Sequence, residues 1–79
     1  MLNRRLRAAT HATAGQLPAQ DVENVLELIE VGEPVLAFDT LCTQLFEYDA
    51  SVPLSVRDEL ADLGRGMQLA PSLWKNLGR

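Results

Sequence analysis

Few side chains in this sequence have the types and spacing that catalysis requires. Catalysis needs groups that converge with compatible roles, and the 79 residues include one histidine, His11, one cysteine, Cys42, and no pair of histidines. There is no glycine-rich phosphate loop, and the stretch after Asp49 lacks the alternating oxygen ligands of a calcium loop. We therefore expect no enzymatic activity, no metal ion and no cofactor.

Simple structural roles suffice for both of these residues. His11 lies among alanines and threonines, where a solvated helix residue is more common than a ligand or general base. Cys42 lies between Leu41 and Leu45, so we expect a small buried hydrophobe rather than a reactive thiol. A single cysteine forms no disulfide within the chain, which favours a reducing compartment, and we expect the cytoplasm.

The carboxylates are more informative, because they are concentrated in the middle of the chain. All eleven acidic residues lie in the segment 21–62, where Arg57 is the only base, while both ends of the chain are basic and the net charge is -4. A surface so rich in carboxylates repels phosphate backbones, so we expect this segment to bind no nucleic acid directly.

Acids also recur on single faces of the predicted helices. Glu23, Glu27 and Glu30 have the spacing i, i+4 and i+7, and each like-charged pair of this kind destabilises an isolated helix by about 0.2 to 0.5 kcal/mol. Further along, Leu36 projects into the polar sector that contains Asp39. Two interpretations remain open: a solvated surface that keeps the protein soluble, or a docking surface for a basic protein.

Helical periodicity, proline and glycine together predict the elements that position these residues. Nothing alternates with the period of a strand. We expect an all-α fold, a compact bundle of four to five short helices in a single domain over residues 1–79, with 1–17 forming a short helix or a flexible arm. The predicted segments are 3–14 ending at Gly15, 19–31 closed by Gly32, 34–48 with Pro34 in its first turn, a helix capped by Ser55 and reaching Met67, and a last turn opened by Pro71.

The third predicted helix is the most apolar and is expected to form the centre of the core. Trp74, the largest side chain, is expected to cap that core from the last turn. At 100° per residue, the residues expected to face the core are Val35, Phe38, Leu41, Cys42, Leu45, Phe46 and Tyr48.

The sequence also bears on membranes and export. No apolar run approaches the roughly 20 residues that a bilayer crossing needs, so we expect no membrane association. The arginines near the start are followed by Ala, Thr, His and Gly rather than by an apolar stretch, so we expect no signal peptide.

One segment resembles a known family. The stretch "IEVGEPVLAFDTLCTQLFEYD", residues 29–49, resembles the central signature of MafI-type immunity proteins, the small partners of bacterial polymorphic and contact-dependent toxins. The resemblance continues more loosely through "VPLS", residues 52–55, and "LADLGRGMQLAPSLWKNL", residues 60–77. The first 15 residues lie outside it.

The resemblance implies an inhibitor that binds the C-terminal toxic domain of a cognate effector. When it is free, we expect the protein to be a monomer or a weak homodimer. Many such toxins are nucleases, whose basic clefts an acidic domain can occupy. Tyr48 is open to two interpretations, since its helical position also favours the core. The expected partner-binding residues are Glu30, Glu33, Asp39, Glu47, Tyr48 and Asp49, to which the helical periodicity adds Leu36.

Two other classes of function remain as alternatives. A helical adaptor or assembly module would self-associate through Leu36 and the Trp74 end, with the acids serving solubility only. A DNA-binding regulator would use Arg4, Arg5 and Arg7, although three arginines without an interleaved aromatic residue are a weak electrostatic footprint.

Overall fold

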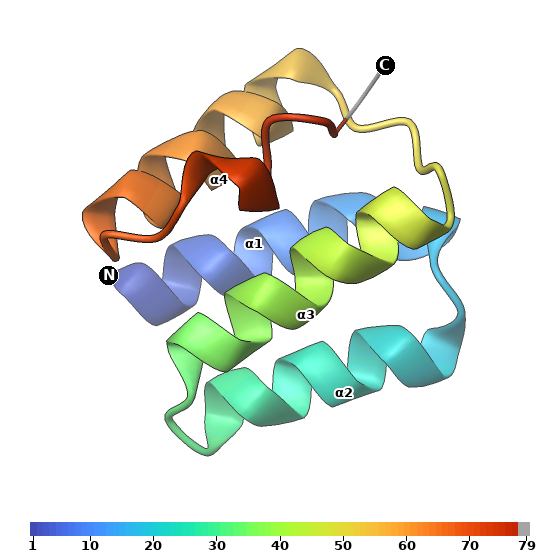
Figure 1. Ribbon diagram of the computed structural model, residues 1–79. Helices are drawn as coiled ribbons and strands as arrows, with labels where there is room; N and C mark the ends of the chain where they lie inside the picture. Colours follow the sequence, from blue (N-terminus) through green and yellow to red (C-terminus); the bar gives the residue numbers. More distant parts are fainter. Residues whose placement is uncertain (78–79) are drawn as a thin grey trace.

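Short helices separated by proline and glycine make up the computed structural model, which describes residues 1–77 (Figure 1). The all-α fold with a bundle of short helices is confirmed, and each predicted segment is found, the last of them as a 3-10 turn. Among the described residues the elements are α1 (Leu2–Thr13), the 3-10 turn η1 (Ala14–Gln16), α2 (Ala19–Glu30), α3 (Pro34–Glu47), α4 (Leu54–Gly66) and the 3-10 turn η2 (Pro71–Leu73).

The helices run alternately up and down, with α1 at the centre of the packing. Figure 1 shows α1 and α3 running in one direction and α2 and α4 returning in the other. Helix α1 packs against α2, α3 and α4, and α2 lies beside α3. The C-terminal turn η2 packs against both α3 and α4, so a segment without regular helix closes that side of the bundle.

Helices α2, α3 and α4 end in the same way, with a residue of positive φ that turns the chain out of the helix. These residues are Gly32 after α2 (φ 80°), Asp49 after α3 (φ 50°) and Gln68 after α4 (φ 60°). In each case the following amide bonds back to a carbonyl five residues earlier, as when Glu33 N donates to Leu28 O at 2.9 Å. This Schellman arrangement satisfies carbonyls that the helix end would otherwise leave unpaired.

The predicted N-cap of α4 is wrong. Ser55 makes no capping hydrogen bond, because α4 begins one residue before it, at Leu54, with Pro53 as its N-cap. The Pro53 carbonyl accepts hydrogen bonds from Val56 N at 3.0 Å and Arg57 N at 2.9 Å. A proline side chain contains no acceptor, so α4 starts without a side-chain cap.

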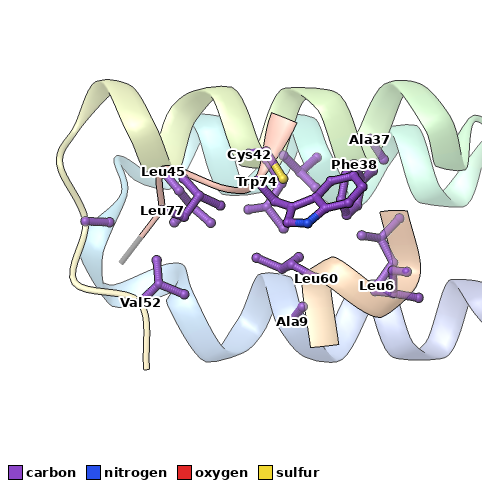
Figure 2. Packing of buried hydrophobic residues seen from close by; sticks show 14 of the residues in the cluster. Leu6, Ala9, Ala37, Phe38, Cys42, Leu45, Val52, Leu60, Trp74 and Leu77 are labelled. Carbon is purple, nitrogen blue, oxygen red and sulfur yellow. The ribbon is translucent and has the colours of Figure 1, made fainter. Parts of the chain in front are cut away.

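The core is formed by side chains from every helix and is closed by Trp74, as expected (Figure 2). Phe38 is fully buried, and its ring meets that of Trp74 edge to face, with centroids 5.9 Å apart and an interplanar angle of 76°. Such a pair adds about 0.5 to 1.5 kcal/mol beyond the area that it buries. Leu6 of α1, Leu41 of α3 and Leu60 of α4 are equally inaccessible to solvent.

Three residues that were expected in the core are exposed instead. Val35, Phe46 and Tyr48 are 48%, 57% and 51% exposed, and Ala37 is buried instead. Val35 and Phe46 lie at one edge of the face of α3 that was predicted to be buried, beyond the part that the bundle covers. Tyr48 follows the last residue of α3, so the helical period no longer sets its direction. The buried face of α3 is therefore narrower than predicted.

Within residues 1–77, no helix has the length and apolar character that crossing a bilayer demands.

Candidate protein-docking surface

The seven predicted contact residues all lie on or beside α3, and most are well exposed. Leu36 is half exposed and points away from the core, as predicted. Asp39 is partly covered, and its carboxylate accepts a hydrogen bond from Thr43 Oγ1 at 3.5 Å. The others are Glu30 at the end of α2, Glu33 at the N-cap of α3, Glu47 at the end of α3, Tyr48 at its C-cap and Asp49 in the turn that follows.

These residues do not converge on one point. Helix α3 has 14 residues, which at 1.5 Å per residue is about 21 Å. Glu33 and Leu36 lie at its start, and Glu47 lies at its end. The resulting surface, the α3 strip, consists of Glu33, Leu36, Asp39, Glu47, Tyr48 and Asp49. A strip of this length suits an extended protein surface better than a small molecule.

Glu30 lies to one side of the α3 strip and has a partner within the chain. Its Oε2 atom lies 3.5 Å from Nη2 of Arg7 on α1, while its side chain stays 74% exposed. An exposed pair of this kind contributes little to stability. Glu30 is therefore placed at the boundary between the strip and the α1 side of the molecule.

Acids at the ends of α2 and α3 oppose the electrostatics of the helices themselves. The last turn of α2 contains Glu27 and Glu30, the last turn of α3 contains Glu47, and neither turn contains a basic residue. A helix C-terminus carries partial negative charge, so an acid there costs about 0.3 to 1 kcal/mol. Stability alone does not account for this arrangement.

Phe46 and Val35, both predicted to lie in the core, extend the apolar part of this surface. A signal in the sequence could have identified them. At 100° per residue, Phe46 lies about 20° and Val35 about 40° from Asp39, which had been placed on the outer face. Both share the Asp39 side of α3, so apolar and acidic groups alternate along it.

The N-terminal arginines are largely engaged by carboxylates of the same chain. Arg5 Nε donates to Glu59 Oε2 at 2.7 Å, and its Nη2 donates to Glu59 Oε1 at 2.9 Å and to Asp62 Oδ2 at 2.6 Å. The Arg5 hydrogen bonds lower the pKa of both carboxyl groups and raise the pKa of the guanidinium. Arg5 thus ties α1 to α4, and of the three arginines only Arg4 has no ion pair among the described residues.

The cysteine is buried as expected. Cys42 is 1% exposed, and burial, helped by the charge of Asp39, raises the pKa of its thiol to about 12. At neutral pH the group stays protonated and is a poor nucleophile. In the described part of the chain, no cluster of His, Cys, Asp and Glu is arranged to hold a metal ion.

A scan against protein-family models and searches of curated proteins and of solved structures find no match to this chain.

Proposed function

We propose that this protein is an immunity protein, which binds the C-terminal domain of a cognate bacterial toxin one to one in the cytoplasm and blocks it without catalysis of its own. The observation that carries this proposal is the α3 strip, in which carboxylates and exposed apolar side chains lie along one helix and at its two ends, and in which Glu47 opposes the dipole of that helix. The motif "LCTQLFEYD", residues 41–49, which covers the second half of α3 and the turn after it, supports the proposal through the resemblance to MafI-type proteins.

The physical mechanism follows from charge. An enzyme that acts on a phosphate chain needs a basic cleft, and an acidic strip about 20 Å long fits into such a cleft as a competitor. Opposite charges steer the two proteins together, with on-rates that approach 10⁸ to 10⁹ M⁻¹s⁻¹ at low salt. Leu36 and Tyr48, each about half exposed, would then provide the desolvated contacts that slow dissociation.

Co-expression tests the proposal directly. The proposal predicts that the reading frame immediately upstream encodes the toxin. The C-terminal domain of that product is expressed in a bacterial host with and without this protein at an equal level. We expect growth to be restored and a one-to-one complex to appear on size exclusion. Persistent lethality together with no complex would refute the function.

A self-associating helical module remains the second candidate, because Val35 and Leu36 place two exposed apolar side chains in the first turn of α3. Trp74, the other predicted contact, is 8% exposed and packs within its own core. A concentration-dependent dimer in sedimentation that Leu36→Asp abolishes would favour this candidate. A monomer at all concentrations would exclude it.

A further inference from the structure

The exposed ring of Phe46 borders a hollow between α3 and the C-terminal segment. The volume of this hollow beside Phe46 is about 180 Å³. An apolar cavity of roughly 150 Å³ is large enough for benzene, so this one has room for one leucine or phenylalanine side chain. It is lined by Cys42, Thr43 and Phe46 of α3 and by Ser72, Leu73, Asn76 and Leu77 of the C-terminal segment.

Groups of opposite charge lie next to residues that line this hollow. The wall residue Thr43 is hydrogen-bonded to the carboxylate of Asp39. An adjoining hollow, also bordered by Phe46, is lined by Arg57 and Lys75. The Nε atom of Arg57 is buried and has no hydrogen-bond acceptor among residues 1–77.

An occupant with matching chemistry follows from this arrangement. In a matching occupant, an apolar group fills the hollow, a cation pairs with Asp39, and a carboxylate pairs with Lys75 and Arg57. A second copy of this chain is a poor fit, because the strips of both copies would bring carboxylates together and each molecule carries a net charge of -4. A protein partner can present all three groups on one surface.

We propose that the hollow beside Phe46 is the anchor pocket of the docking surface, and that it receives one apolar side chain of the toxin, flanked by a basic residue facing Asp39 and an acidic residue facing Lys75 and Arg57. This inference rests on the proposed function and names the contact through which the inhibitor holds its target. A side chain anchored in a well-packed, desolvated pocket commonly dominates binding energy, while the charges at the rim set orientation and rate.

The pocket is tested first without the toxin, with benzene as the probe. In ¹⁵N-labelled protein titrated with millimolar benzene, we expect saturable shifts of the amides of Thr43, Ser72 and Asn76. Ser72→Phe, which fills the hollow, should abolish these shifts, and the matched control Ser51→Phe, at an exposed loop position, should preserve them. Shifts confined to other surfaces, or none at saturation, would overturn the inference.

The second test uses the toxin domain. Phe46→Ala and Ser72→Phe should each raise the dissociation constant about tenfold or more, while the control Leu54→Ala, which removes an exposed apolar side chain at the start of α4, should leave it within about twofold. If the wild-type protein protects cells but both pocket variants bind normally, the anchor pocket is refuted and the function stands. If the wild-type protein gives no protection, the function and the anchor pocket are both refuted. A homodimer whose interface covers this hollow would also overturn the anchor role.

Discussion

At the level of single residues, the ring of Trp74 lies directly against the backbone of Gly64. A Cβ atom added at Gly64 would lie 2.1 Å from Trp74 Cζ3, which no small adjustment relieves. Gly64→Ala should therefore displace the indole and destabilise the fold by about 1 to 3 kcal/mol or more, measured by urea unfolding. Gly66→Ala is the matched control, since nothing lies within 4 Å of its added Cβ. Equal stability of the two variants would contradict the packing described.

Cys42 offers a test of burial through its chemistry. Because its pKa is raised to about 12, the thiol should not react with a disulfide reagent at pH 8 until the protein unfolds. The unfolded thiol loses its proton near pH 8.5, whereas the folded one retains it. The unfolded state then binds fewer protons, so this group lowers stability as pH rises from about 8.5 towards 12. Rapid labelling of the native protein would show that the core opens.

At the level of elements, two of the three helix-ending turns have a residue other than glycine at positive φ. An L-residue with a side chain pays roughly 1 to 2 kcal/mol in this conformation, and glycine does not. Gln68→Gly should stabilise the protein by about 1 kcal/mol. Gly32→Ala should destabilise the protein by a similar amount, although the Cβ atom added at position 32 meets no atom within 4 Å. Thermal unfolding of the two variants measures both. A stability change of the same sign in both would refute the conformational explanation.

The link between α1 and α4 depends on the ionisation of Glu59 and Asp62. Their pKa values are lowered by Arg5, so the stabilisation is present above the ordinary carboxyl pKa, near 4, and is lost as pH falls through the lowered values. Arg5→Gln should lower the midpoint of urea unfolding at pH 7. The difference in midpoint between this variant and the wild type should shrink below about pH 4. Arg4→Gln, on the same helix, should have little effect at either pH. A pH-independent loss would assign Arg5 a packing role only.

Local signals predicted the elements better than their contacts. Gly32 and Pro34 marked the turn between α2 and α3 correctly, because φ preferences act within a few residues. Ser55 failed as a cap because Pro53 had already started the helix. The pairing of Arg5 with Glu59 joins residues 54 positions apart, and no local pattern encodes such a contact.

At the level of the whole molecule, packing decides which predicted surface residues can act together. Helical period predicted that Leu36, Asp39 and Glu47 share the outer face of α3, while Glu33, Tyr48 and Asp49 were expected from the family resemblance. The exposure of Phe46 was not predicted, because it depends on where η2 and the C-terminal segment meet α3. The hollow beside Phe46 joins α3 to residues near position 75, and it exists only in the folded chain.

The position of Glu47 allows stability and binding to be separated in one substitution. Glu47→Lys places a cation at the C-terminus of α3, where the helix dipole favours it, and should stabilise the fold by about 0.3 to 1 kcal/mol. The same change puts a positive charge in the α3 strip, so association with the toxin should slow and lose part of its salt dependence. Glu23→Lys makes an identical change of net charge on α2, outside the strip. Stopped-flow association at several salt concentrations compares the two variants. If both variants slow association equally, net charge rather than the α3 strip steers the complex. If only Glu47→Lys slows association, and it also raises the unfolding temperature, then Glu47 is retained for binding at the expense of stability.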